Sequence, residues 1–281
     1  MEAAMSTRPV VVITGATNGL GRLVALDLAQ QGARLAVVAR DPDKAASLRR
    51  ETEADVFIAD LASLSDVRRV GAEIAARYDQ VDVLVNNAGL HAFAQRRTED
   101  GVAEMTAVNY LAPWLLTATL RDKLTGRVVN VASEAARQVK TLDPQADLLA
   151  TEDFSRRESF ARYGRTKLMD IMFTQELSRR LAGTDVTVNC CDPGFNTSGL
   201  GRELPLAGPL EKVLKALRIG DPRRGAGIIR SLCTDDRFAT TTGGYFSHRD
   251  AKPLECPAAG RGEQIQKELW DATAALVGMA L

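Results

Sequence analysis

Six short, valine-rich runs recur along the chain, and longer amphipathic stretches lie between them. The runs span residues 10–14, 34–39, 55–59, 81–86, 126–133 and 185–191. They are apolar on both faces, which is typical of parallel strands covered by helices on two sides. Strand–helix alternation repeated this often predicts an α/β fold, a doubly wound parallel sheet with helices on both faces. With a further short strand in "GGYFS", the sheet should have about seven strands.

Boundary signals mark several of the helices between these strands. The stretch "LGRLVALDLAQQG" ends at Gly32, and glycine is typical of the position just after a helix. The next helix opens with Asp41 as its N-cap and Pro42 in its first position. No repeat, low-complexity tract or linker divides the 281 residues. The sequence therefore predicts one domain over residues 1–281.

Two segments break the alternation. Residues 137–162 are polar and irregular, and residues 194–222 are rich in glycine and proline with a short helical piece at "LEKVLKALR". Both follow expected strands, at the carboxyl edge where open α/β sheets bind ligands. We expect them to form the substrate-side loops and to act as a mobile lid over the substrate.

Composition narrows the possible partners and the compartment. Lys+Arg and Asp+Glu number 36 each, so no net charge attracts nucleic acid or an anionic membrane. No apolar run is long enough to span a bilayer. The four cysteines (Cys190, Cys191, Cys233 and Cys256) have no metal-like spacing, so we expect reduced thiols in a cytoplasmic protein. With only two histidines, His91 and His248, neither a metal site nor a histidine-based triad is expected.

A glycine-rich turn, "TGATNGLG" at residues 14–21, directly follows the first expected strand. In a strand–turn–helix unit, glycines let the backbone approach a dinucleotide pyrophosphate, and the helix N-terminus offers free N–H groups. Gly15, Gly19 and Gly21 give the spacing Gly-x-x-x-Gly-x-Gly instead of Gly-x-Gly-x-x-Gly. A glycine-rich turn without a ligand is the alternative. A P-loop is excluded because no Gly-Lys-Ser/Thr follows.

Five motifs along the chain resemble those of one protein family. They are "TGATNGLG", "NNAG" at 86–89, "RVVNVAS" ending at Ser133, "YGRTK" at 163–167 and "DPG" at 192–194. Their order and approximate spacing resemble the short-chain dehydrogenase/reductases over residues 10–277. The resemblance implies a single Rossmann-type domain, a nicotinamide cofactor and hydride transfer to or from a carbonyl or alcohol carbon. It implies cofactor contacts from Gly15, Thr17, Asn18, Gly19, Leu20, Gly21, Asp60, Leu61, Asn87, Ala88 and Gly89.

The end of the second expected strand indicates which nicotinamide cofactor is used. An NAD site places an acidic residue there, roughly 20 residues after the glycine motif, to bind the ribose 2′-hydroxyl. Here Ala39 takes that place and Arg40 follows, and an arginine can bind a 2′-phosphate. Asp41 is explained better as a helix cap. NADP(H) is therefore expected, with a solvated Arg40 of no function as the alternative.

Tyr163 and Lys167 stand four residues apart, so on a helix their side chains share one face. An adjacent ammonium and the positive charge of an oxidised nicotinamide favour phenolate and lower the phenol's pKa toward the working range. The family resemblance makes Asn109, Ser133, Tyr163 and Lys167 the catalytic set. Tyr163 would donate the proton and Ser133 would bind the carbonyl oxygen. Lys167 would bind the nicotinamide ribose, and Asn109 would hold a water that links Lys167 to solvent.

The segment "DPGFNT" resembles the part of the family that binds the nicotinamide carboxamide, through Pro193, Gly194 and Thr197. The long interval between Ser133 and Tyr163 resembles the retinol dehydrogenase and protochlorophyllide reductase branch. The sequence after Asn196 looks like bacterial ketoreductases that tailor aromatic polyketides such as anthracyclines. We therefore expect an NADPH-dependent carbonyl reductase for a bulky, largely apolar ketone, as a monomer or homodimer. An alcohol or retinol-type dehydrogenase working oxidatively and a non-catalytic NADP(H)-binding regulator remain alternatives.

Overall fold

One eight-stranded sheet runs through the structure, a computed structural model that describes residues 8–194 and 221–279. The strand order is β3-β2-β1-β4-β5-β6-β7-β8, and all neighbours pair in parallel except β7 and β8. The strands are β1 Val10–Thr14, β2 Arg34–Ala39, β3 Asp55–Ile58, β4 Val81–Asn86, β5 Leu124–Val131, β6 Thr187–Asp192, β7 Tyr245–Ser247 and β8 Pro253–Leu254. The predicted α/β Rossmann-type sheet is confirmed. The two-residue antiparallel strand β8 was not predicted, because "PL" carries no strand pattern.

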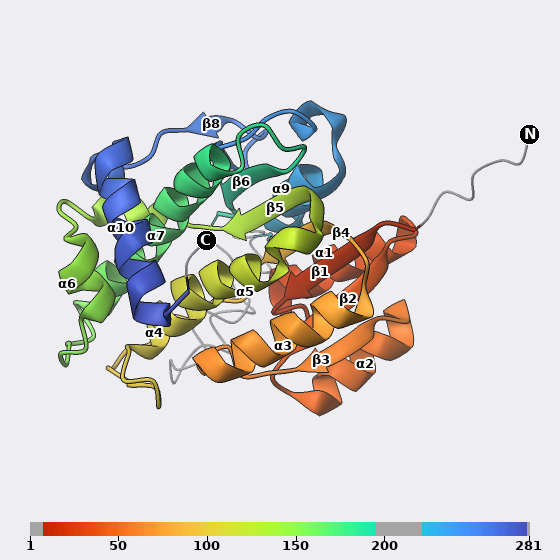
Figure 1. Ribbon diagram of the computed structural model, residues 1–281, viewed down its shortest axis with the longest axis horizontal. Helices are drawn as coiled ribbons and strands as arrows, with labels where there is room; N and C mark the ends of the chain where they lie inside the picture. The colour runs from red at the N-terminus through yellow and green to blue at the C-terminus, as the bar shows by residue number, and fades with distance from the viewer. Residues whose placement is uncertain (1–7, 195–220, 280–281) are drawn as a thin grey trace, which may run out of the picture.

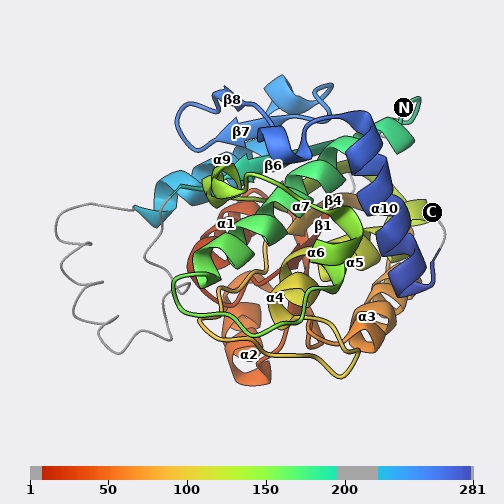
Figure 2. The same ribbon diagram turned by 90° about the vertical axis from the view of Figure 1, so that its left-hand side faces the viewer.

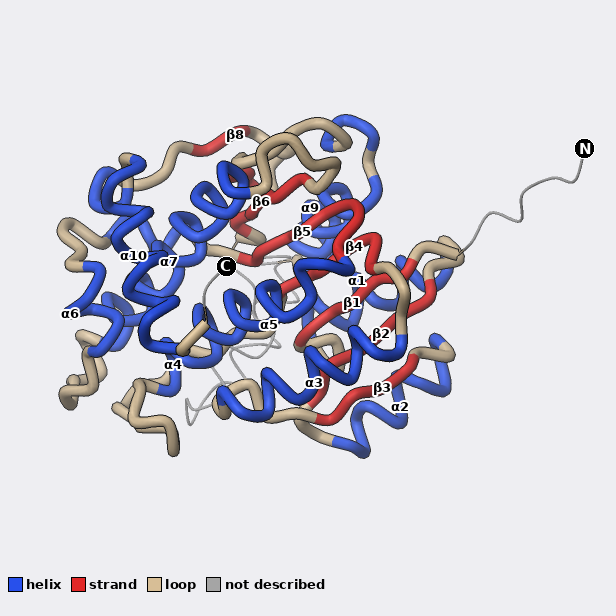
Figure 3. The backbone as a smooth tube through the Cα atoms, in the orientation of Figure 1, coloured by secondary structure: helices blue, strands red, loops and turns tan. Residues whose placement is uncertain are grey.

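Helices cover both faces of this sheet (Figures 1 and 3). One face carries α3, α5 and α7, with α10 packed on α7; the other carries α1, α2 and α9. Figure 2 shows the sheet between α1 on one side and α5 and α10 on the other. The helices are α1 Gly19–Gln30, α2 Pro42–Thr52, α3 Leu64–Arg77, α4 Glu104–Thr106, α5 Ala112–Leu120, α6 Pro144–Leu149, α7 Ser159–Arg180, α9 Pro222–Thr234 and α10 Glu263–Val277. Among the described helices, none is both long and apolar enough to cross a membrane.

Alternate residues of each central strand enter two different cores. In β1, Val10 and Val12 join the core beneath α3, α5 and α7, whereas Val11 and Ile13 join the core beneath α1, α2 and α9. Successive side chains on a strand point to opposite faces, so a strand that is apolar throughout must be covered on both sides. This is the physical reason for the valine-rich runs.

The predicted helix boundaries are confirmed at two places. The Asp41 carboxylate accepts hydrogen bonds from the backbone of Asp43 and Lys44, each at 3.1 Å, and Pro42 is the first residue of α2. Gly32, after the end of α1, has φ +88°, a conformation that other residues rarely adopt. All four cysteines are buried free thiols, as expected.

The two irregular segments differ in how far the structure describes them. Residues 137–162 contain α6 and the first turn of α7, and α6 packs against α10. This part is therefore more ordered than its polar sequence indicates. Residues 195–220 lie outside the described chain, together with Thr197 and the helical piece predicted at 210–218.

Candidate active site

The sheet order reverses beside β1, which has β2 on one side and β4 on the other. The turn after β1 and the "NNAG" loop after β4 therefore lie next to each other at the carboxyl edge of the sheet. In open α/β sheets, ligands bind at such a reversal point.

The glycine turn after β1 lies close against the "NNAG" loop. Gly15 has φ +67°, and a Cβ there would lie 2.9 Å from the Cα of Ala88, too close for any side chain. The amide of Asn87 donates to the carbonyls of Thr14 and Gly15 at 2.9 and 3.2 Å. The Thr14 hydroxyl accepts from the backbone of Asn87 and Ala88 at 3.1 and 3.0 Å. Thr14, which the sequence analysis did not select, therefore fixes the shape of the turn.

The N-terminus of α1 points its free amides out of this turn. Asn18, the N-cap, makes no capping hydrogen bond with its side chain among the described residues, and the first turn of α1 contains no acidic residue. Unpaired N–H groups and the positive end of the helix dipole suit an anion.

Arg40 is exposed at the end of β2, and Ala39 before it is buried. Within the described ranges the Arg40 side chain has no ion pair or hydrogen bond, whereas Asp41 is occupied in capping α2. Asp60 and Leu61, both half-buried, follow β3; the Asp60 carboxylate accepts from the backbone of Ala62 at 3.0 Å. Among the described residues, the end of β2 thus presents an arginine without a partner, next to a carboxylate that is engaged in capping α2.

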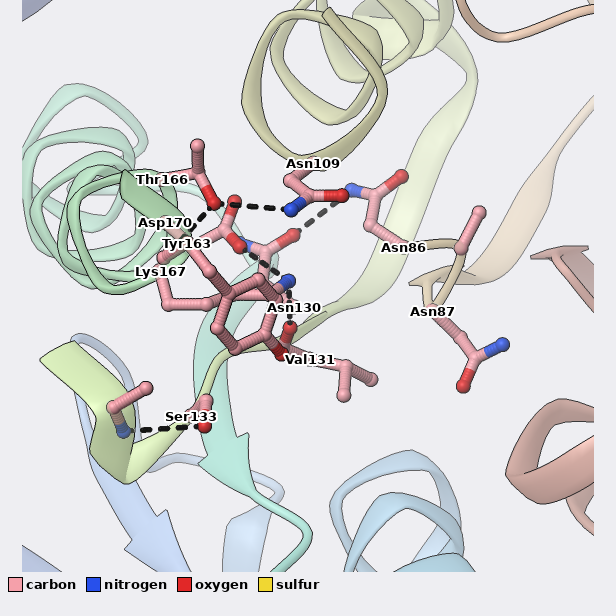
Figure 4. Close-up of polar contacts among 12 residues, drawn as sticks. Asn86, Asn87, Asn109, Asn130, Val131, Ser133, Tyr163, Thr166, Lys167 and Asp170 are labelled. Atoms are coloured by element: carbon pink, nitrogen blue, oxygen red, sulfur yellow. Dashed lines mark hydrogen bonds and ion pairs between the residues drawn. The ribbon is translucent and has the colours of Figure 1, made fainter. Parts of the chain in front are cut away.

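Asn109 sits in a π-helical turn, Ala107–Leu111, between α4 and α5. Such turns are frequent at functional sites because they release backbone groups from the regular helix ladder. The Asn109 amide donates to the carbonyl of Leu90 at 2.9 Å and to the Thr166 hydroxyl at 3.0 Å, and it accepts from the backbone of Leu90 at 2.8 Å. Asn109 therefore ties the "NNAG" loop to α7 (Figure 4). Both hydrogens of its amide nitrogen are used in these two bonds.

Ser133 lies two residues after the end of β5, where it caps a 3₁₀ turn, Glu134–Gln138. Its oxygen accepts from the backbone of Ala135 at 3.2 Å, and its hydroxyl hydrogen can be donated to the Tyr163 oxygen or to a ligand. Helix α7 approaches this turn closely at Gly164, where a Cβ would lie 2.6 Å from the Ala135 carbonyl oxygen. The close approach brings Tyr163 against Ser133.

Tyr163 and Lys167 are both buried on the inner face of α7 (Figure 4). The Lys167 ammonium donates to the Val131 carbonyl at 2.8 Å and to the Asp170 carboxylate at 2.9 Å. It also lies near the "NNAG" loop, since a Cβ on the exposed Gly89 would be 3.6 Å from Nζ. The two residues predicted to act together are therefore placed together, at the edge where the glycine turn opens.

The charges around Tyr163 act in opposite directions. Burial raises the pKa of the phenol above its ordinary value, while Lys167 and the neighbouring Ser133 hydroxyl lower it and Asp170 and Asp192 raise it. Burial outweighs Lys167, which acts in the expected sense, and the net direction from these residues is upward. Burial disfavours the ammonium, but Asp170 and Tyr163 raise the pKa of Lys167. At neutral pH the unliganded site therefore holds a phenol and an ammonium.

Pro193 and Gly194 follow β6 as predicted, and Gly194 has φ +74°. The Asp192 carboxylate accepts from the backbone of Gly194 at 3.1 Å and of Glu134 at 3.0 Å. This carboxylate links the start of the Gly/Pro-rich segment to the turn that Ser133 begins. Thr197 lies outside the described residues.

Comparison with known proteins identifies the family. Residues 9–142 match the short chain dehydrogenase family. Over 275 residues, 95% of this chain and 92% of the relative, the chain is 36% identical to the Streptomyces sp. (strain C5) protein named "Putative daunorubicin C-13 ketoreductase DnrU". The chain belongs to the short-chain dehydrogenase/reductase family.

Two further matches extend over almost the whole chain. Retinol dehydrogenase 14 of Homo sapiens is 35% identical over 296 residues, 96% of this chain and 86% of that protein. A crystal structure of a Mycobacterium paratuberculosis protein superimposes with a TM-score of 0.76 at 25% identity, covering 99% of this chain and 98% of that one.

Short-chain dehydrogenase/reductases use NAD(H) or NADP(H), and the residues of this chain fit such a cofactor. Gly15 lets the glycine turn pack closely against the "NNAG" loop, and the uncapped amides of α1 suit a pyrophosphate. The glycine turn, the "NNAG" loop and Lys167 lie along one edge of the sheet. A dinucleotide is long and needs contacts spread along such an edge.

Three side chains beside Tyr163 were not selected from the sequence. His91 stacks on the phenol ring with centroids 5.0 Å apart, and Phe160 lies 6.3 Å from the same ring. Asp170 pairs with Lys167. Phe160 and Asp170 lie three residues on either side of the Tyr163–Lys167 motif, so helical spacing could have placed both beside it. His91 carries no such signal, because its position depends on the loop after β4.

Proposed function

We propose that this protein is an NADPH-dependent carbonyl reductase acting on a bulky, largely apolar ketone, with Tyr163 as proton donor. The observation that supports it most is the placement of the Tyr163 phenol, buried beside Ser133 and Lys167 at the carboxyl edge of the sheet. Asn109 completes the proposed catalytic set by holding the "NNAG" loop against α7.

The proposed reaction is a reduction of a carbonyl to an alcohol. NADPH, when bound, supplies a hydride to the carbonyl carbon. The Ser133 hydroxyl donates a hydrogen bond to the carbonyl oxygen and polarises it, and the Tyr163 phenol gives that oxygen its proton. Lys167 stabilises the phenolate left behind and orients the nicotinamide ribose. A phenol whose pKa is raised by burial carries its proton at neutral pH, as the proton donor in a reduction must.

We infer NADP(H) as the cofactor from Ala39 and Arg40. An exposed guanidinium without a partner in the described chain can hold a 2′-phosphate by charge-assisted hydrogen bonds. The proposed contacts at the other end of the cofactor are Pro193, Gly194 and Thr197, with Asp60 and Leu61 at the adenine.

Replacing Arg40 with alanine should therefore reduce the preference for NADPH over NADH. The change should appear mainly as a higher KM for NADPH, because the 2′-phosphate is remote from the reacting carbon. Steady-state kinetics with both cofactors measure it, with Arg50→Ala as control, since Arg50 is an exposed arginine on α2. A wild-type kcat/KM for NADH equal to or above that for NADPH would rule out the assignment.

Aromatic side chains next to Tyr163 support a bulky, apolar substrate. His91 has its ring 4.6 Å from that of Phe93 and 5.8 Å from that of Phe160. Phe160 is 43% exposed, one of few large apolar side chains in the described chain with so much open surface. The names of two relatives, a daunorubicin ketoreductase and a retinol dehydrogenase, likewise refer to bulky molecules. We propose that residues 137–162 and 194–222 form the substrate-side loops of a single domain.

If Phe160 contacts substrate, Phe160→Ala should raise KM for a multi-ring aromatic ketone by about tenfold. Loss of a buried aromatic contact is worth about 1.5–3 kcal/mol, which sets this scale. A small aliphatic ketone, measured with the same variant, serves as the control and should show little change. Equal effects on both substrates would mean that Phe160 does not select by size.

A second candidate is oxidation of an alcohol, which the similarity to retinol dehydrogenase 14 favours. Initial rates with NADPH plus a ketone and with NADP⁺ plus the corresponding alcohol separate the two at neutral pH. If the protein is a reductase, the initial rate of ketone reduction should exceed that of alcohol oxidation. A faster oxidation at neutral pH would support the second candidate.

A further inference from the structure

A buried carboxylate lies directly behind Lys167. Asp170 is one helical turn further along α7, and its side chain is 3% exposed. One carboxylate oxygen lies 2.9 Å from the Lys167 ammonium, and the other has no hydrogen-bond partner among the described residues. Within the described chain Lys167 is therefore the one counter-charge of this carboxylate.

Packing alone does not explain an acid at this position. Buried ion pairs add little stability, and apolar residues of similar volume can replace them at no loss. On the same face of α7, Thr166, Phe173 and Thr174 are buried and carry no charge. The carboxylate therefore does something for Lys167 that an apolar side chain such as leucine could not do, because it accepts a hydrogen bond from the ammonium. Together with the Val131 carbonyl, it fixes two of the three ammonium hydrogens and leaves one for a ligand.

Ionisable groups from three elements face Asp170 or its partner Lys167. They are Tyr163 and Lys167 on α7, Tyr110 on the π-helical turn, and Cys190 and Cys191 on β6. Burial raises the pKa of Tyr110 and of both thiols, so these groups remain neutral. Burial also raises the pKa of Asp170, to about 6, and Lys167 opposes this. Above that pH Asp170 is an anion, and Asp192 is the other carboxylate acting on Tyr163.

We propose that Asp170 is a positioning residue, whose carboxylate anchors the Lys167 ammonium and keeps the Tyr163–Lys167 pair fully protonated to higher pH than the pair would reach alone. The inference rests on the proposed function, since the fully protonated pair is the state that reduces a ketone. Two coupled groups lose their first proton as a pair. A neighbouring negative charge makes that loss harder, whichever of the two residues gives up the proton.

The test replaces Asp170 with asparagine, which keeps an acceptor for Lys167 and removes the charge. The rate of ketone reduction falls at high pH when the pair loses a proton. In Asp170→Asn this fall should move to lower pH by roughly one unit, the scale on which one nearby charge shifts a pKa. At low pH the rate should stay within a few fold of wild type. Carbon-13 NMR of labelled tyrosine and lysine in the unliganded protein gives a readout without turnover. Of the Tyr163 and Lys167 resonances, the one that changes first as the pH rises should change at a lower pH than in wild type.

Glu176→Gln is the matched control. Glu176 is another buried carboxylate on α7, but it pairs with Arg179 and Arg180, away from Lys167. Removing the Glu176 charge should leave unchanged the pH at which the rate of ketone reduction falls. If Asp170→Asn does not fold, Asp170→Glu keeps the charge and should leave the fall at the wild-type pH.

Two outcomes overturn the inference. One is an Asp170→Asn enzyme whose profile and NMR titration coincide with wild type while its melting temperature changes, as a purely structural residue predicts. The other is an Asp170→Glu enzyme whose fall moves to lower pH. A wild-type protein that reduces no ketone would instead contradict the proposed function, and the NMR titration would still decide the role of Asp170.

Discussion

Replacing Tyr163 with phenylalanine should lower kcat for ketone reduction by at least about 100-fold, the lower range of what a general acid contributes. The phenol supplies the proton that the reduced oxygen takes. The other buried carboxyl group near Ser133 in the described chain is Asp192, and both of its oxygens accept hydrogen bonds, from the backbone of Glu134 and of Gly194. Cofactor affinity should change little, because the ring that stacks on His91 is retained. Fluorescence titration with NADPH measures the affinity, and steady-state kinetics measure kcat.

The matched variant for this experiment is Ser133→Ala, which removes the second hydroxyl of the site. It should lower kcat with NADPH affinity nearly intact, because Ser133 is proposed to contact the carbonyl oxygen alone. A Tyr163→Phe enzyme that reduces a ketone within a few fold of wild type would show that the proton comes from another group.

Replacing Lys167 with alanine should damage both rate and cofactor binding. The ammonium is proposed to stabilise the phenolate of Tyr163 and to bind the nicotinamide ribose, so kcat should fall by about 100-fold. The dissociation constant for NADPH should rise by about 10- to 100-fold, the effect of losing hydrogen bonds to a charged group worth about 1.5–3 kcal/mol. The same titration and kinetics distinguish this double effect from the single effect of Tyr163→Phe.

Lys167→Ala also leaves Asp170 buried without its counter-charge. Breaking a buried ion pair in this way destabilises a fold by about 3–5 kcal/mol. The loss is smaller here if Asp170 takes up a proton and becomes neutral. Because burial raises the pKa of Asp170, its protonation stabilises the variant as the pH falls, and the free energy of unfolding should decrease as the pH rises. The double variant Lys167→Ala/Asp170→Asn should regain stability at neutral pH without regaining activity. If the double variant is also the more active one, Lys167 has only a structural role.

Much of the fold could be predicted because local patterns and tertiary structure agree. The runs at β1, β2 and β4 match their strands to the residue, since a strand covered on both faces is apolar throughout. The cap of α2 at Asp41 needs only local hydrogen bonds, and these are visible as a sequence pattern. Strand β5, in contrast, ends at Val131 and not at Ser133, because Ser133 turns its side chain back to cap the next turn.

The environment of the site could not be predicted in the same way. The net pKa direction of Tyr163 depends on how deeply the helix is buried, which the spacing of a motif does not contain. The stacking of His91 depends on the path of the loop after β4. The side chain of Asn109 holds Leu90 and Thr166, and this contact depends on the π-helical turn, which the sequence pattern does not indicate.

Oxidation of NADPH across a panel of ketones and quinones tests the central claim most directly, with NADPH binding measured in parallel on the same protein. The account predicts that NADPH binds and is consumed with at least one bulky, apolar ketone, yielding the corresponding alcohol in equal amount. It predicts slower consumption with small, polar ketones. A protein that binds NADPH tightly and consumes none with any carbonyl compound would contradict the account and would identify a cofactor-binding regulator built on the same fold.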